Sequence, residues 1–144
     1  MPYDRSIRYE KRDEAEEYMT PKERFLAAMR GEETDRPAVG SATSVATVEQ
    51  MERTGASFPE AHYDREQMFT LAAQAYEELG YDVIMPYFSI WLGCAAMEIE
   101  MNWGDRTTMP EGETPYESPS EIEIPDDYLE NEPITALCDV LGRL

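Results

Sequence analysis

The strongest constraint in this sequence is a long amphipathic helix signal that leads directly into an apolar segment. Asp64 is typical of a residue that caps a helix, Gln67 occupies the reciprocal position, and Gly80 is typical of a residue that ends one. Residues 83–88 follow at once and predict a strand buried on both sides. The apolar side chains that share one face of the helix are Met68, Leu71, Ala72, Ala75, Tyr76 and Leu79.

A second strand signal precedes this helix. Residues 37–45 are apolar and rich in small side chains, and they predict a buried strand that runs into a loop at residues 40–44. A helix over residues 48–53, ended by Gly55, and a connection over residues 57–63 follow. Strand, helices and strand in this order are the pattern of a βαβ unit, so we expect an α/β fold with a parallel sheet.

The N-terminal region predicts one more helix. Residues 20–23, Thr-Pro-Lys-Glu, form a capping box with proline at the first helical position, and Gly31 is a stop signal. Residues 1–18 are polar and mixed in charge, so we interpret them as a loosely ordered extension before a domain that spans residues 19–144. The apolar stripe of the predicted helix consists of Phe25, Leu26 and Met29.

The C-terminal region is less regular. Polar and apolar residues alternate over residues 97–103, which predicts a half-exposed strand in a small hairpin or in an excursion from the main fold. Residues 105–127 are acidic and contain four prolines, so we expect a long connection with little regular structure. Pro133 then opens a last helix, whose apolar face holds Ile134, Leu137, Cys138 and Leu141.

The charge excludes some classes of partner. The chain has 31 acidic and 12 basic residues, a net charge of −19, whereas a nucleic-acid-binding surface needs a basic footprint. No apolar run reaches the roughly 18 residues that span a bilayer, and the first residues lack the apolar core of a signal peptide. We therefore expect a cytoplasmic protein without a nucleic-acid or membrane partner. Adaptation to high salt and an ordinary acidic surface both remain open.

The metal-binding residue types are sparse. Cys94 and Cys138 are too few for a disulfide framework and are expected to be free, buried thiols. With His62, the only histidine, they match no compact zinc pattern, so we predict no metal site in this chain.

Six residues are candidates for contact with a substrate. Ser41, Thr43 and Ser44 follow the first predicted strand, and Tyr87 and Ser89 follow the second. Loops after barrel strands line active sites, although such hydroxyls also serve as ordinary caps. His62 precedes the long helix, where it either contacts a substrate or positions the helix entry. The sequence has no phosphate loop, nucleophile elbow or paired carboxylates, so we assign no catalytic residue.

Two groups of residues carry a resemblance to a known family. Residues 19–31, followed by Asp35-Arg36-Pro37, resemble the opening of proteins in the uroporphyrinogen decarboxylase superfamily. Residues 40–52 and 54–56, with Phe58-Pro59-Glu60-Ala61-His62, look like the methylcobamide:coenzyme M methyltransferase branch found in methanogenesis. The resemblance covers residues 19–144.

The resemblance implies a (β/α)8 TIM barrel that moves a methyl group from a methylated corrinoid protein to the thiol of coenzyme M. It also implies a zinc ion that activates this thiol as a thiolate. The zinc ligands of the family, a His-x-Cys pair and a further cysteine, lie in its C-terminal half. This sequence has no His-x-Cys, so no ligand is carried over. Zinc and the methylcobamide-bearing partner are thus expectations for the full-length family.

A barrel of this type takes about 250 residues. We therefore expect this chain of 144 residues to form an incomplete, N-terminal portion that is inactive alone. It should self-associate or bind a complementary C-terminal half. Two alternatives remain open: a fragment of a decarboxylase acting on a porphyrinogen, and a non-catalytic module that binds a corrinoid protein. The decarboxylase needs cationic side chains for its substrate's carboxylates, which a chain of net charge −19 supplies poorly.

Overall fold

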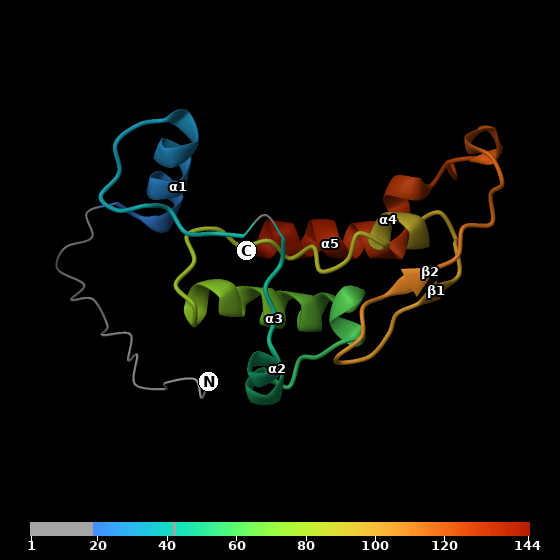
Figure 1. Cartoon of the computed structure of the whole chain (residues 1–144), viewed down its shortest axis with the longest axis horizontal. Coiled ribbons are helices and arrows are strands. Elements are labelled where there is room, and N and C mark those ends of the chain that lie inside the picture. Colours follow the sequence, from blue (N-terminus) through green and yellow to red (C-terminus); the bar gives the residue numbers. More distant parts are fainter. Residues whose placement is uncertain (1–18, 42) are drawn as a thin grey trace, which may run out of the picture. The chain divides into compact units, whose positions relative to one another are not determined.

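The computed structural model describes residues 19–41 and 43–144 (Figure 1). The chain divides into two compact units, residues 1–38 and residues 39–144, and each is described here by itself. The predicted extension at residues 1–18 lies outside the described residues. Of the helices that the structure describes, none combines the length and apolar character that crossing a bilayer requires.

The first unit contains helix α1, Pro21–Arg30, as the capping box predicts. Thr20 and Glu23 exchange both hydrogen bonds of the box, and Gly31 ends the helix in the left-handed conformation with φ of 72°. The expected apolar stripe is not the buried face, because Leu26 is partly exposed and Met29 is 71% exposed. The buried positions of α1 are Arg24 and Ala27.

Arg24 is buried because its guanidinium group is paired with Asp35. Arg24 Nε donates to Asp35 Oδ1 at 2.6 Å, and the same guanidinium donates to Asp35 Oδ2 at 2.8 Å and to the Met19 carbonyl at 2.6 Å. Asp35 also accepts from the backbone N–H groups of Met19 and Arg36. The hydrogen bond from Arg24 holds the pKa of Asp35 far below its usual range. These bonds fix the loop after α1 against the start of the helix.

The second unit is organised around helix α3, Arg65–Glu77. The helix packs against α2 (Val48–Thr54), against the short 3-10 helix η1 (Glu60–His62) and against α5 (Glu132–Arg143), which runs beside it in Figure 1. Asp64 caps α3 as predicted. The reciprocal bond of Gln67 is absent, because its side chain accepts from the Ser57 N–H instead. The buried core consists of Met51, Ala56, Ala61, Met68, Leu71, Ala72, Phe88 and Val140.

Two predicted members of the α3 stripe are not buried. Tyr76 and Leu79 are exposed at the C-terminal end of the helix, whereas Met68 and Leu71 have no exposed surface. Gly80 ends the helical segment with φ of 67°, and its N–H donates to the Tyr76 carbonyl.

Helix α5 begins near Pro133 as predicted, and its buried face matches the expected one in part, since Ile134 and Leu137 are partly buried and Leu137 packs against the core. Ala136 and Val140 are fully buried, whereas Cys138 and Leu141 are exposed. Arg143 fixes the end of the helix. Its guanidinium donates to both carboxylate oxygens of Glu66, at 2.7 and 3.0 Å. The Cζ atom of the same guanidinium lies 4.4 Å from the centre of the Phe69 ring. The expectation that Cys138 is a buried thiol is therefore wrong.

The predicted parallel strands at residues 37–45 and 83–88 do not form within the described residues. The two segments do meet, since Asp82 N–H donates to the Val39 carbonyl at 2.7 Å and the Asp82 carboxylate accepts from Val39 N–H at 2.7 Å. A strand ladder needs a run of backbone hydrogen bonds, and here a side chain takes the place of the next backbone acceptor. Pro86 has no N–H to donate to a ladder. The expected parallel sheet is thus not observed.

The described sheet is a small antiparallel hairpin. Strand β1, Met101–Asn102, pairs with β2, Glu111–Gly112, and Met101 lies opposite Gly112. The hairpin was predicted, but its first strand is shorter than residues 97–103, because helix α4 (Leu92–Ala95) and a turn precede it. The connection over residues 105–127 is mostly irregular as expected, apart from β2 and the 3-10 helix η2 (Pro119–Glu121). A further 3-10 helix, η3 (Tyr128–Glu130), leads to α5.

The contact between the two extended segments generates a prediction. A Cβ atom at Gly40 would collide with the Val83 side chain, so Gly40→Ala should destabilise the second unit by about 1 to 3 kcal/mol. Gly142→Ala is the matched control: a Cβ there meets nothing, and alanine in a helix should stabilise by up to about 1 kcal/mol. Urea unfolding followed by circular dichroism measures both. Equal effects of the two substitutions would contradict the contact.

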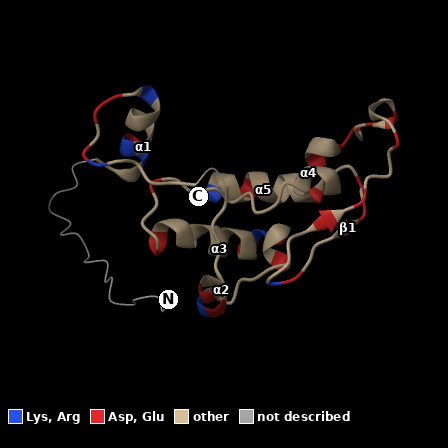
Figure 2. Cartoon of the chain, viewed as in Figure 1, with Lys and Arg blue, Asp and Glu red and all other residues tan. Residues whose placement is uncertain are grey.

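The surface charge generates a second prediction. Figure 2 shows acidic residues on most described elements and few basic ones, in line with the net charge of −19. Added ions screen the repulsion between like charges, so the thermal midpoint should rise by several degrees between low and molar potassium chloride. The exposed ion pairs, such as Arg65 with Glu132 at 2.8 Å, should weaken over the same range but contribute little. A midpoint that falls with salt would show that attraction between charges outweighs repulsion.

Candidate functional site

His62 lies in an aromatic cluster inside the second unit. It is the last residue of η1 and only 2% exposed. Its ring stacks on Phe58, with ring centres 4.4 Å apart, and on Trp103, at 5.8 Å. Phe58 in turn meets the edge of the Phe88 ring at 5.3 Å. The cluster therefore joins the connection before α3 to the hairpin and to the segment after α3.

The His62 ring is buried without a full set of hydrogen bonds. Its Nδ1 atom has no partner among the described residues, and the same holds for Nε2 of Gln50, another buried side chain. Burial lowers the pKa of His62 to about 4, so the ring is neutral at physiological pH. A neutral, enclosed imidazole with one unused nitrogen suits a hydrogen bond to a bound group more than exchange of protons with water. Contact between His62 and a substrate remains a prediction.

The hydroxyls after the first extended segment bond to each other. Ser41 Oγ lies 3.3 Å from Thr43 Oγ1 and accepts from the Thr43 N–H at 3.3 Å. Ser44 is partly buried. This local turn is the capping chemistry that such residues commonly perform.

The two residues after the second extended segment also have local partners. Tyr87 Oη donates to the Ile90 carbonyl at 3.1 Å, and burial raises the pKa of its phenol, assisted by the neighbouring Tyr128 and Cys94. Ser89 is buried, and its Oγ accepts from the Trp91 N–H at 3.1 Å in the turn before α4. In the described part of the chain, no hydrogen bond joins the Ser41–Thr43 turn to Tyr87, Ser89 or His62. The contact of Gly40 with Val83 brings only the preceding parts of the two segments together.

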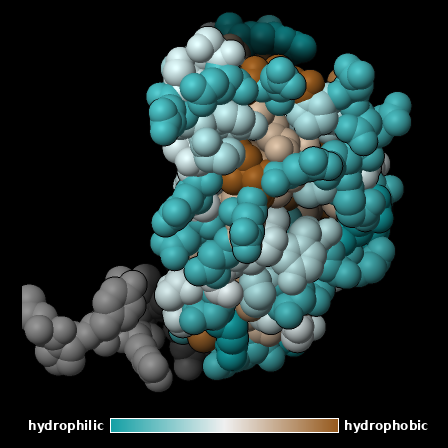
Figure 3. Space-filling model, turned by 90° about the vertical axis from the view of Figure 1, so that its right-hand side faces the viewer, coloured by the Kyte–Doolittle hydropathy of each residue, from teal (hydrophilic) through white to brown (hydrophobic). Residues whose placement is uncertain are grey.

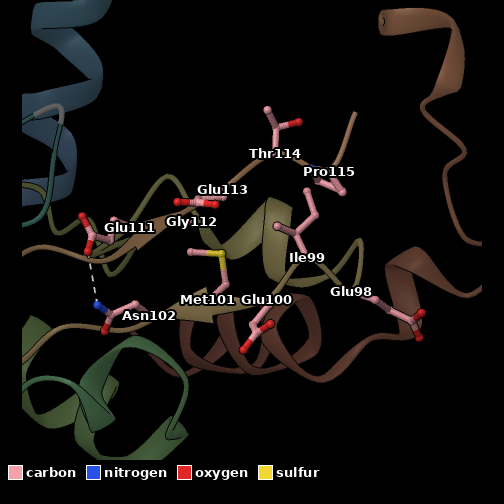
Figure 4. Close-up of a pocket in the computed structure, with 10 residues that line it drawn as sticks. All are labelled: Glu98, Ile99, Glu100, Met101, Asn102, Glu111, Gly112, Glu113, Thr114 and Pro115. Atoms are coloured by element: carbon pink, nitrogen blue, oxygen red, sulfur yellow. Dashed lines mark hydrogen bonds between the residues drawn. The ribbon is translucent and has the colours of Figure 1, made fainter. Parts of the chain in front are cut away.

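A shallow groove along the hairpin is a feature that the sequence interpretation missed. Figure 4 shows carboxylate side chains from both sides of the hairpin around it, and Asn102 donates to Glu111 at 3.2 Å. The available signal was the alternation of glutamate with apolar residues over residues 98–101 and the glutamates at 111 and 113, but the pairing of the two strands depends on a turn of eight residues. The groove is lined by Glu98, Ile99, Glu100, Met101, Asn102, Glu111, Gly112, Glu113, Thr114 and Pro115.

Zinc has no evident place among these residues. Over residues 19–41 and 43–144, no group of three or more His, Cys, Asp or Glu side chains is arranged to hold a metal ion. Cys94 is partly buried and Cys138 is exposed, and the two lie on different helices. His62 is enclosed by aromatic rings. The donors in the described part of the chain therefore do not fit a zinc site.

The burial of His62 predicts a dependence of stability on pH. An unfolded histidine has a pKa of about 6.5, so between pH 6.5 and 4 the unfolded chain binds a proton more readily than the folded one. Above pH 6.5 the neutral His62 makes its full contribution to the unfolding free energy. As the pH falls this contribution is lost, and the loss reaches about 2 to 3 kcal/mol at pH 4. His62→Phe keeps an aromatic ring but removes the proton. Between pH 7 and pH 4, the unfolding free energy of the wild-type chain should fall relative to that of His62→Phe. Equal losses in the two proteins would contradict the lowered pKa of His62.

Comparisons with known proteins place the chain in a family. Residues 20–144 match the family described as Uroporphyrinogen decarboxylase (URO-D). A methylcobamide:CoM methyltransferase, MtaA, of Methanosarcina barkeri is 35% identical over 127 residues, which cover 85% of this chain and 37% of the relative. A methylated-thiol–coenzyme M methyltransferase of Methanosarcina mazei is 30% identical over 126 residues, or 88% of this chain and 34% of the relative. The chain thus spans little more than a third of these relatives.

A solved structure agrees with these matches. A methyltransferase from Methanosarcina mazei superposes with a TM-score of 0.78 at 31% sequence identity, over 87% of this chain and 38% of that one. The resemblance predicted from residues 19–31 and from the segment up to His62 is therefore confirmed at the level of the family. The chain belongs to the uroporphyrinogen decarboxylase (URO-D) family, and its relatives in these comparisons are methyltransferases.

Proposed function

We propose that this chain supplies the N-terminal portion of a (β/α)8 barrel that transfers a methyl group from a methylated corrinoid protein to coenzyme M. The observation that carries the proposal is the match to a methyltransferase structure, with a TM-score of 0.78 over 87% of the chain. Relatives named as methylcobamide:CoM methyltransferases support the donor and the acceptor. In this proposal the barrel is incomplete, and the chain acts in the cytoplasm.

In this proposal, residues of this chain line the active site and do not bind its metal ion. The donors among the residues that the structure describes do not fit a zinc ion, so no step of the reaction is assigned to zinc. Ser41, Thr43, Ser44, Tyr87 and Ser89 follow the two extended segments that would enter the barrel as strands, where loops line the active-site mouth. His62 would contribute its unpaired Nδ1 as a hydrogen-bonding group. No residue of this chain is proposed to be catalytic.

The missing strand ladder is consistent with this proposal. Among the described residues, the backbone hydrogen bond near these segments joins Val39 to Asp82, just before residues 83–88, and further bonds would come from neighbouring strands. The exposed apolar side chains include Leu141 on α5 and Ile90 after the second segment. Exposed apolar surface favours association, so we propose that a complementary C-terminal portion covers them, or that the chain self-associates in its absence.

Charge disfavours the decarboxylase alternative. That reaction requires cationic side chains to hold the carboxylates of a porphyrinogen. Among the described residues, several arginines already pair with acidic side chains, as in the ion pair of Arg53 with Glu78. Others are Arg24, Arg65, Arg106 and Arg143.

Complementation tests the proposal. The chain is co-expressed with the C-terminal part of the Methanosarcina mazei relative that lies beyond the matched region, and the transfer of methyl from methylcobalamin to coenzyme M is measured. The mixture should be active and each part alone should be inactive. The reason is that this chain supplies residues that line the site, whereas the C-terminal part supplies the metal ligands. Sedimentation of the mixture is the control for association. Activity of the chain alone, or a stable but inactive complex, would contradict the proposal.

A further inference from the structure

The segment of residues 122–125, Ile-Glu-Ile-Pro, is an exposed stretch that neither the core nor the candidate site uses. It joins η2 to η3 and forms no helix or strand, and Ile122 has extended backbone, with φ of −73° and ψ of 115°. Ile122 and Ile124 are 46% and 69% exposed. Ile122 and Ile124 alternate along the segment, and alternate side chains of an extended chain point to the same side, so pairing as a strand would place both isoleucines on one apolar face.

The backbone of this segment is also unused. Within the described residues, no backbone hydrogen bond involves the N–H or C=O groups of Glu123 and Ile124. An exposed, extended apolar segment with free backbone groups is a template for strand addition to another sheet. Pro125 cannot donate, so it limits the length over which such pairing can extend.

Charge selects the kind of partner. Residues 117–130 contain six acidic residues and neither lysine nor arginine, and the loop they form is marked by acidic residues without basic ones in Figure 2. Pairing with a second copy would place these carboxylates opposite each other, which is destabilising. A sheet edge flanked by lysine or arginine would instead meet complementary charge.

We infer that residues 122–125 are a docking strand for a protein that offers an exposed sheet edge with an apolar stripe and flanking basic residues. The two isoleucines contact the stripe, the backbone of Glu123 and Ile124 pairs with the edge, and the surrounding carboxylates attract the basic residues. Figure 3 shows one face of the molecule, which is mostly hydrophilic with separate hydrophobic patches. The inference does not depend on the proposed methyl transfer.

The test uses the full chain and a synthetic peptide of alternating lysine and valine with blocked ends as the probe. Nuclear magnetic resonance titration of the isotope-labelled chain should shift the amide signals of Ile122, Glu123 and Ile124 and slow their hydrogen exchange. Replacing both isoleucines, Ile122→Ser with Ile124→Ser, should weaken binding about tenfold because the apolar contact is lost. Met109→Ser is the matched control, since Met109 is equally exposed but lies outside the segment.

Three outcomes would overturn the inference. If a peptide with a methylated backbone binds as tightly, backbone pairing is absent and only charge attraction remains. If the shifts spread evenly over all acidic surfaces, residues 122–125 are not the site. If the chain self-associates without peptide and the double serine variant does not, the occupant is a second copy. Circular dichroism of the variants confirms that these exposed substitutions leave the fold intact.

Discussion

The burial of one face of α3 is the interaction on which the second unit depends. Met68 and Leu71 have no exposed surface, and each fully buried side chain of this type stabilises by about 2 kcal/mol. The helices α2, η1 and α5 all pack on α3, although they come from separate parts of the sequence. The ion pair of Arg143 with Glu66 and its contact with Phe69 then tie the end of α5 to the start of α3. The contribution of this exposed pair is secondary to the apolar contact.

The helices could be predicted from sequence because their signals are local. The capping box at Thr20, the cap at Asp64 and the proline near the start of α5 all mark observed helix ends. The predicted parallel strands at residues 37–45 and 83–88 were wrong, because a strand exists only where a neighbour provides backbone partners. Residues 83–88 have strand-like composition, but Asp82 bonds to Val39 through one backbone and one side-chain contact and no ladder follows. Burial of Arg24 was also missed, since it depends on Asp35, eleven residues away.

The candidate site was predictable as a set of residues and not as an arrangement. The sequence identified His62 before α3, but its ring contact with Trp103 joins positions 41 apart. Likewise, the hydroxyls of Ser41 and Thr43 follow a strand-like segment, and the structure shows them bonded to each other. Residue types and local spacing can be read from the sequence. The distant side chain that completes a cluster is determined by the fold.

The stacking of His62 on Trp103 gives the molecule an internal optical reporter. Indole fluorescence responds to an adjacent imidazole, and a protonated imidazole quenches it more strongly than a neutral one. Because Trp103 follows β1 and His62 ends η1, the emission of this indole depends on whether the hairpin stays packed against the core. Trp91, the other tryptophan of the sequence, lies at the start of α4 and has no ring contact with His62. Trp91→Phe would therefore leave one indole whose emission follows the docking of the hairpin in solution.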